Sequence, residues 1–229
     1  MINPRHMSSE WIDWHAGYAD GSPLSARLRV VQGFITRALD DAPPGPIPVV
    51  SMCAGDGRDL LGVVTEHPRG ADVRARLVEL DPQLAAAGRE RAQRQSAGQI
   101  DVVTGDAATT DAYAGAVPAW LVLVCGVFGN ITDDDVHRTI DNLSGLCTER
   151  AWVIWTRGRF EPDFTPTIRS WFTNAGYDEI GFTAIPDTLV AVGAHRLTAS
   201  PAPFRAGTRL FAFLPRNQRP SQVAGRAPR

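Results

Sequence analysis

The amino-acid sequence predicts an α/β fold with a mostly parallel sheet that ends in an antiparallel hairpin. Two observations lead to this prediction. From residue 46 onward, short apolar runs alternate with longer runs rich in Ala and Arg, which is the pattern of strands joined by helices. Beyond residue 176, strand-like runs follow one another without a long helix between them, which is typical of antiparallel pairing.

Composition is typical of a globular protein and excludes several kinds of partner. The chain has 229 residues, 44% of them hydrophobic, which suffices for one domain with a continuous core. A net charge of -2 gives no general attraction to nucleic acid or to an anionic membrane, and no apolar run approaches the roughly 20 residues that span a bilayer. The first residues lack the basic-then-apolar order of a secretion signal. We therefore expect a cytoplasmic protein that acts on a small molecule, with no nucleic-acid or membrane partner.

The chain contains no lysine, and this absence excludes several enzyme classes. Schiff-base enzymes, pyridoxal-phosphate enzymes, lysine-containing phosphate loops and Tyr-xxx-Lys dehydrogenases all require a lysine amine. The three cysteines form no CxxC pair and the five histidines are scattered, so the sequence predicts no metal site.

The first predicted element is helical. Apolar residues spaced three or four apart over residues 8–40 predict a helix, and Ser22 with Pro23 suits a cap and a first turn. The run APPGPIP then breaks the helix. This Trp-rich segment could be a lid over a pocket or the contact of a homodimer. The chain thus divides into a helical segment at 1–45, an α/β domain at 46–215 and a tail, expected to be disordered, at 216–229.

Within the α/β domain, periodicity and turn residues place the elements in order. We expect helices at residues 59–66, 82–96, 133–146 and 165–175. We expect strands at residues 48–54, 73–80, 100–104, 120–125, 151–156, 180–185, 189–197 and 208–214. Open α/β sheets bind ligands at the carboxyl edge of their strands, so candidate site residues are sought where these strands end.

The first candidate site is the run VVSMCAGDGRDLL, Val49 to Leu61. A strand enters a turn that contains Gly55 and Gly57 and then passes directly into a helix. Small residues let main-chain amides approach a ligand closely, and a helix N-terminus favours an anionic group. The alternative is a strand-to-helix turn that needs glycine only for a positive φ.

The second candidate is an acid at the end of the next strand. Glu79 lies 22 residues beyond Gly57, where a carboxylate can accept hydrogen bonds from both hydroxyls of a ribose. Asp81 is the second choice and could instead cap the helix that opens at Pro82. Either acid alone could be an ordinary strand-end residue, but a glycine turn followed by a distant acid is more specific than either part.

Two further loops follow the third and fourth expected strands. Asp106, in VVTGDA, could accept a hydrogen bond from an adenine amino group or simply close a turn. The run CGVFGN, Cys125 to Asn130, is a small loop flanked by glycines at the same edge of the sheet.

Together these motifs resemble the class I S-adenosylmethionine-dependent methyltransferase family, over about Val49 to Leu214. VCGVFGNI and WVIWTRGR add a resemblance to a group of small bacterial members. The resemblance implies a Rossmann-like, seven-stranded sheet with an N-terminal helical lid, and S-adenosylmethionine as cofactor. The cofactor-binding residues that it implies are Cys53, Ala54, Gly55, Gly57, Glu79, Leu80, Asp106, Ala107, Cys125 and Gly126.

The glycine motif departs from the family pattern of acid-x-Gly-x-Gly-x-Gly. Ser51 stands in place of the acid and Cys53 in place of the first glycine. Because the acid often steadies the methionine amino group, that contact must come from elsewhere. Cys53 is small enough to keep the turn, and a catalytic role for this cysteine is the less favoured alternative.

Methyl transfer needs alignment of the reacting atoms and, for a protonated nucleophile, a base. His15 and Tyr18 are the candidates for catalysis, because they share one face if their segment is helical. The alternative for His15 is a surface or capping role. Candidate substrate-binding residues are Trp14, Phe128, Asn130 and Arg157, although Asn130 could instead close a turn and Arg157 could be a solvated loop charge.

Three other functions stay open. A nicotinamide-dependent oxidoreductase also pairs a glycine turn with a strand-end acid, but it expects a third glycine where this chain has Leu60. A second alternative keeps S-adenosylmethionine but uses another carbon of the sulfonium or only its charge. A third is a non-catalytic protein that binds S-adenosylmethionine.

Overall fold

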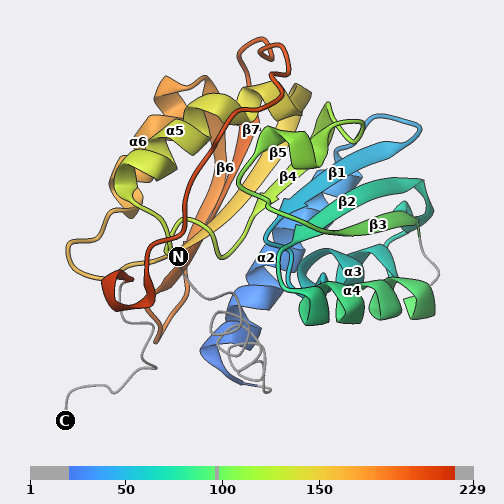
Figure 1. Ribbon diagram of the computed structural model, residues 1–229, viewed down its shortest axis with the longest axis horizontal. Helices are drawn as coiled ribbons and strands as arrows, with labels where there is room; N and C mark the ends of the chain where they lie inside the picture. The colour runs from blue at the N-terminus through green and yellow to red at the C-terminus, as the bar shows by residue number, and fades with distance from the viewer. Residues whose placement is uncertain (1–20, 96–97, 220–229) are drawn as a thin grey trace.

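The computed structural model describes residues 21–95 and 98–219 and contains a seven-stranded sheet in the order β3-β2-β1-β4-β5-β7-β6 (Figure 1). Strands β3, β2, β1, β4 and β5 are parallel, and β7 runs antiparallel to both β5 and β6. This arrangement confirms the predicted fold class. The strands are β1 (Ile47–Met52), β2 (Val73–Glu79), β3 (Gln99–Thr104), β4 (Ala119–Val124), β5 (Cys147–Gly158), β6 (Tyr177–Ala184) and β7 (Val190–Leu197).

Helices cover both faces of the sheet, so the inner strands are buried on both sides. One core cluster joins α2, α3 and α4 to the sheet, and the other joins α5 and α6 to the opposite face. Every residue of β4 is buried, which is why its sequence, AWLVLV, is a continuous apolar run rather than an alternating one. The helices are α2 (Pro23–Asp40), α3 (Arg58–Val64), α4 (Pro82–Gln95), α5 (Asp133–Leu143) and α6 (Thr165–Asn174).

Helix α2 is part of the domain core. Its N-cap is Ser22, whose hydroxyl accepts the N–H of Ser25, as the sequence predicts. The carbonyl of Ala38 accepts a hydrogen bond from the Trp120 indole at 2.7 Å, and Val31 and Ile35 are fully buried. The described part of the predicted lid is therefore a helix packed on the sheet, while residues 1–20 lie outside the described part.

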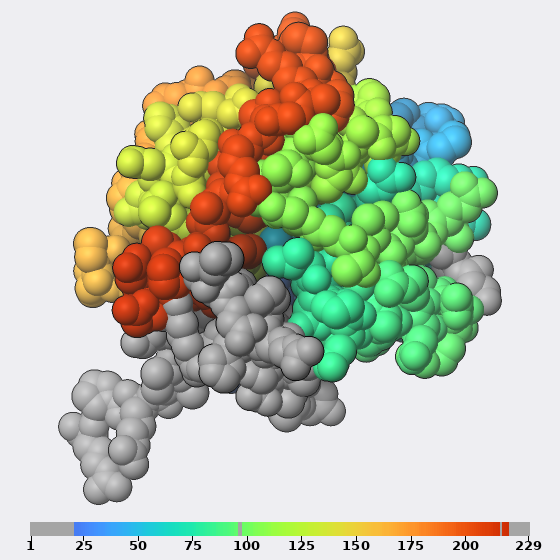
Figure 2. All heavy atoms as spheres, viewed as in Figure 1, coloured from blue at the N-terminus to red at the C-terminus, as the bar shows by residue number. Residues whose placement is uncertain are grey.

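The last predicted strand, residues 208–214, does not join the sheet. The turn after β7 contains Pro201 and Pro203 and leads the chain away from the sheet. Residues 208–214, here called the C-terminal strap, run over the surface beside α5 and the loops after β3 and β4 (Figure 1); Figure 2 shows the strap in red. Leu210 and Phe211 are buried there, so the apolar pattern of this segment reflects packing under α5 and not a sheet position.

Main-chain hydrogen bonds fix the strap to two loops at the carboxyl edge of the sheet. Leu210 donates to the Ala108 carbonyl and Leu214 donates to the Asn130 carbonyl, both at 2.8 Å. Of the tail predicted to be disordered, Arg216–Gln218 form a short 3-10 helix. Among the described residues, none of the helices has both the length and the apolar character that a membrane span requires.

A histidine lies in the core between β5, β6 and α6. His195 on β7 is fully buried, its Nδ1 accepts the indole N–H of Trp155 at 3.2 Å, and its ring stacks on Phe172. Its Nε2 lies 3.8 Å from a carboxylate oxygen of Glu179, which itself pairs with Arg169. Burial lowers the pKa of His195 to about 4, outweighing the opposing effect of Glu179, so the ring is neutral in the folded protein at pH 7.

This pKa predicts that acid destabilises the fold through His195. The unfolded chain takes up the proton near pH 6.5 and the folded chain only near pH 4, so between these values stability falls as pH falls, by about 1.4 kcal/mol per pH unit. Urea unfolding from pH 7 to pH 4 should give a shallower pH dependence for His195→Gln than for the wild type. His137→Gln, at an exposed histidine, is the control and should follow the wild type. Parallel curves for wild type and His195→Gln would contradict the prediction.

Candidate functional site

The strand order reverses at the carboxyl edge between β1 and β4. These strands are neighbours, with Ser51 opposite Leu123, but the chain leaves β1 for α3 on one face and leaves β4 for α5 on the other. Ligands of open α/β sheets bind at such a reversal of strand order. The loops after β1, β2, β3 and β4 all end at this edge, so the structure brings the predicted cofactor-binding residues to one side of the sheet.

The turn after β1 adopts the conformation that the glycine motif predicts, despite the cysteine. Cys53, Gly55 and Gly57 all have positive φ, of 52°, 59° and 74°. Gly57 is also required sterically, because a Cβ there would lie 2.8 Å from side-chain carbons of Leu61 and Leu77. Cys53 is the only one of the three with a side chain, and it occupies the left-handed region at a cost of about 1 kcal/mol.

Glu79 joins the turn after β1 to the ends of β2 and β3. One carboxylate oxygen accepts the N–H of Gly55 at 2.7 Å and the other accepts the N–H of Asp81 at 2.9 Å. Its main-chain carbonyl accepts the N–H of Gly105, just beyond β3, at 2.9 Å. The residue is 8% exposed. The buried carboxylate thus joins the turn after β1 to the loop after β2, and the main-chain carbonyl of the same residue holds the loop after β3.

The two acids of the LVELDP run have different roles. The Asp81 carboxylate accepts the N–H groups of Gln83 and Leu84, at 2.8 and 3.1 Å, and therefore caps α4. Glu79, at the strand end, faces the glycine turn. Of the two alternatives that the sequence leaves open, the cap role belongs to Asp81.

The loops after β2 and β3 place one apolar and one acidic side chain at the surface of this edge. Leu80 follows Glu79 and is 57% exposed. Asp106 accepts the N–H of Ala108 at 2.9 Å and pairs with Arg209 of the C-terminal strap at 2.7 Å. The Asp106 carboxylate is half-exposed, so it is held in place and also reaches the surface.

The loop after β4 begins with a buried cysteine and an open glycine. Cys125 is buried, whereas a Cβ added to Gly126 would meet no atom of the described residues within 4 Å. The N–H of Gly126 donates to the Thr156 hydroxyl and its carbonyl accepts the Asn130 side-chain amide at 2.7 Å. The N–H of Gly126 therefore holds the loop to β5 and its carbonyl closes the loop on itself, while the described residues leave space at the α-carbon.

The predicted substrate-binding residues in this loop have internal partners. Phe128 is fully buried against Trp155 and Phe172, and its contact with substrate stays a prediction. Asn130 is 3% exposed and closes the loop through Gly126, which is the turn-closing alternative. Arg157 donates to the Phe128 carbonyl and pairs with Asp133, so it is not a solvated loop charge. His15, Tyr18 and Trp14 lie outside the described residues.

Both cysteines of the site are neutral thiols. Burial raises the pKa of Cys53 well above its usual value, and the negative charges of Glu79 and Asp106 raise it further. Burial also raises the pKa of Cys125, and nearby Asp59 adds to the effect. A thiolate is the nucleophilic form of cysteine, so this environment opposes catalysis by either residue.

Two ion-pair groups at the site are not evident from the sequence motifs. Asp56, between the two glycines, is buried and pairs with Arg58 at 2.7 Å and with Arg91 of α4 at 2.9 Å. Arg27 of α2 pairs with Asp59 in the first turn of α3 at 3.2 Å. The sequence signal for the first was an acid inside the glycine turn, and no local signal links Arg27 to Asp59.

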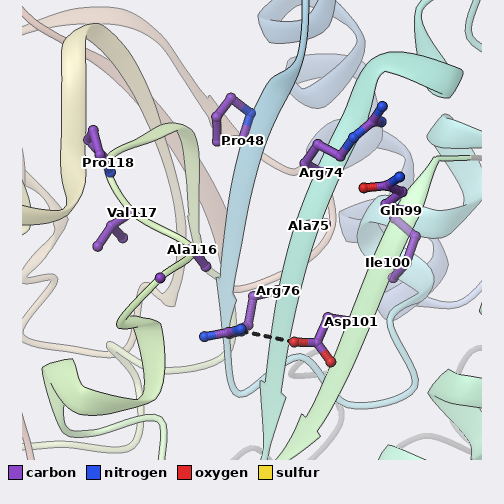
Figure 3. Close-up of a pocket in the computed structure, with 11 residues that line it drawn as sticks. Pro48, Arg74, Ala75, Arg76, Gln99, Ile100, Asp101, Ala116, Val117 and Pro118 are labelled. Carbon is purple, nitrogen blue, oxygen red and sulfur yellow. Dashed lines mark hydrogen bonds and ion pairs between the residues drawn. The ribbon is translucent and has the colours of Figure 1, made fainter.

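A separate groove lies toward the amino ends of β1, β2 and β3 (Figure 3). It is open because residues 105–118, between β3 and β4, form only a short 3-10 helix instead of a helix that would cover the sheet. Arg76 and Asp101 pair across it at 3.1 Å. The groove contains none of the predicted site residues. Over residues 21–95 and 98–219, no group of three or more His, Cys, Asp or Glu side chains is arranged to hold a metal ion.

Comparisons with known proteins identify the fold. No family model and no curated protein matches the sequence. Magnesium protoporphyrin IX methyltransferase from Synechocystis, solved with bound S-adenosylmethionine, is similar over 85% of this chain and 94% of its own, with a TM-score of 0.63 and 13% identity. 1,6-Didemethyltoxoflavin-N1-methyltransferase from Burkholderia thailandensis, solved with its substrate and S-adenosylhomocysteine, is similar over 87% and 92%, with a TM-score of 0.59 and 15% identity.

A third structure, an O-methyltransferase family protein from Burkholderia thailandensis, matches 75% of this chain and 57% of its own at a TM-score of 0.56 and 14% identity. At these identities the likeness concerns the fold. The chain therefore has the Rossmann-like fold of solved methyltransferases.

Proposed function

We propose that the chain transfers the methyl group of S-adenosylmethionine to an oxygen or nitrogen atom of a small molecule. The observation that carries this proposal is the Glu79 carboxylate, which is buried at the carboxyl end of β2 and hydrogen-bonded to the turn that contains Gly55. The proposal is further supported by the fold that the chain shares with solved methyltransferases.

The residues present fit the adenosine half of this cofactor. A carboxylate oxygen can accept two hydrogen bonds, so Glu79 can hold the two main-chain N–H groups and also accept from ribose hydroxyls. Exposed Leu80 offers an apolar face to a flat base, and Asp106 with Ala107 offers polar groups to its edge. The absence of a side chain at Gly126 leaves space for a ligand beside the main chain.

When bound, S-adenosylmethionine supplies a methyl group that is already activated by a positive sulfur. The task of the chain is then to hold the methyl carbon in line with the acceptor atom and to exclude water. We propose that the main chain at Cys125 and Gly126 borders the reacting centre, and that Asn130 and Arg157 act as positioning residues by fixing this loop. His15 and Tyr18 remain the predicted groups for removing a proton from the acceptor, with Trp14 as a predicted substrate contact.

A nicotinamide cofactor suits this site less well. Leu60 stands where a third glycine would allow close packing of the helix, and it is 1% exposed within the core. The small-molecule class of the acceptor is proposed from the net charge of -2 and from the substrates that the two solved methyltransferases are named for. We propose that the protein acts in the cytoplasm.

The proposal predicts micromolar binding of S-adenosylmethionine and S-adenosylhomocysteine. Calorimetric titration of the full chain should detect both, and should detect no NAD binding under the same conditions. Binding of NAD alone would contradict the proposal and favour an oxidoreductase. Binding of the two adenosyl compounds without release of S-adenosylhomocysteine in any substrate screen would favour the non-catalytic binding protein.

The ribose assignment predicts the effect of changing Glu79. Glu79→Gln should weaken S-adenosylhomocysteine binding by about 10- to 100-fold, because charge-assisted hydrogen bonds to two hydroxyls are lost. Glu90→Gln makes the same change at an exposed position on α4 and should leave the affinity unchanged.

Because Glu79 also holds neighbouring loops in place, a second ligand is needed to distinguish a direct ribose contact from a structural role. The wild type should bind S-adenosylhomocysteine more tightly than its 2′-deoxy analogue, and folded Glu79→Gln should lose this preference. If Glu79→Gln weakened the binding of both ligands equally, Glu79 would have only a structural role and would not contact the ribose.

A further inference from the structure

We propose that the ion pair of Arg27 and Asp59 recognises the amino-acid end of S-adenosylmethionine, with the guanidinium facing the carboxylate and the Asp59 carboxylate facing the ammonium. This inference rests on the proposed function, because it assigns the half of the ligand that Glu79 does not reach.

The ion pair lies beside the carboxyl ends of β1 and β4. Arg27 is on α2 and Asp59 is in the first turn of α3, immediately after the Gly57 cap. The two side chains are joined by contacts of 3.2 and 3.5 Å, with exposed side-chain fractions of 5% and 18%. The charges of both act on the Cys125 thiol, which places the pair beside the end of β4.

Helix packing alone does not explain a buried ion pair at this position. Desolvation of two charges costs about as much as their attraction returns, so apolar side chains of similar size would hold two helices together as well. Helices α2 and α3 are also joined by a hydrogen bond, which the Gln32 amide donates to the Arg58 carbonyl at 3.1 Å. A buried charged pair at the edge where the proposed cofactor binds is better explained by a charged ligand.

The chemistry of the ligand matches the pair. The amino-acid end of S-adenosylmethionine carries one positive and one negative charge, and Arg27 with Asp59 offers the complementary two. Guanidinium groups bind carboxylates with two parallel hydrogen bonds.

The glycine turn lacks the acid that often contacts the methionine ammonium of S-adenosylmethionine in the family that the sequence resembles. Ser51 stands in the place of that acid on β1 and is uncharged and buried. Asp56 is the nearest other acid along the chain, but it pairs with Arg58 and Arg91. Asp59 is thus the carboxylate positioned to take over this contact.

The test compares two ligands that differ only in the amino-acid end. S-adenosylhomocysteine carries it, and 5′-methylthioadenosine lacks it. Calorimetric titration of Arg27→Met and Asp59→Asn should give S-adenosylhomocysteine dissociation constants at least about tenfold higher than the wild type. The dissociation constant of 5′-methylthioadenosine should stay within about twofold in both variants.

Two controls keep the result interpretable. Gln32→Leu removes the hydrogen bond from α2 to the Arg58 carbonyl and should leave the affinities for S-adenosylhomocysteine and 5′-methylthioadenosine unchanged. Arg27→Lys retains the charge without the two-pronged geometry and should weaken S-adenosylhomocysteine binding by several-fold. It replaces Arg27→Met if that variant fails to fold, and thermal unfolding identifies which variants are folded.

Each outcome separates this inference from the proposed function. If the wild type binds neither ligand, the proposed function fails. Suppose instead that the wild type binds both ligands, and that folded Arg27 or Asp59 variants bind both equally more weakly or with unchanged affinity. The ion pair is then structural, so the inference is overturned while the proposed function stands.

Discussion

The buried carboxylate of Glu79 holds the turn after β1 and the loop after β2 together at the carboxyl edge of the sheet. The carboxylate accepts the main-chain N–H groups of Gly55 and Asp81, and the main-chain carbonyl of Glu79 accepts the N–H of Gly105. Removing it would leave two N–H groups without this acceptor and separate the turn after β1 from β2. The same carboxylate is the group best placed to bind a ribose, so the fold and the proposed function depend on one side chain.

Other contacts hold the glycine turn and the neighbouring loops in place despite the cysteine at position 53. Cys53 takes the left-handed conformation that glycine would adopt, and the rest of the turn is locked by Asp56 between two arginines. At the opposite side of the edge, the C-terminal strap fixes the loops after β3 and β4 through Ala108 and Asn130. A site with an unusual glycine motif is thus kept rigid by ion pairs and by a segment distant in sequence.

The fold followed from the sequence because each element carries its own signal, as in the continuous apolar run of β4 and the cap at Ser22. Glu79 was predictable because its position after a strand is a local property. The strap, residues 208–214, was mistaken for a strand because alternating apolar residues do not specify what they pack against. The partners of Asn130, and of Arg27, depend on tertiary contacts that no local pattern encodes.

A crystal structure of the protein grown with S-adenosylhomocysteine would show directly whether Glu79 binds the ribose. We expect the ligand at the carboxyl edge of β1, β2 and β4, with both ribose hydroxyls on the Glu79 carboxylate and the adenine beside Leu80. Ligand bound instead in the groove near Arg76, or at the carboxyl edge with its ribose away from Glu79, would contradict this expectation.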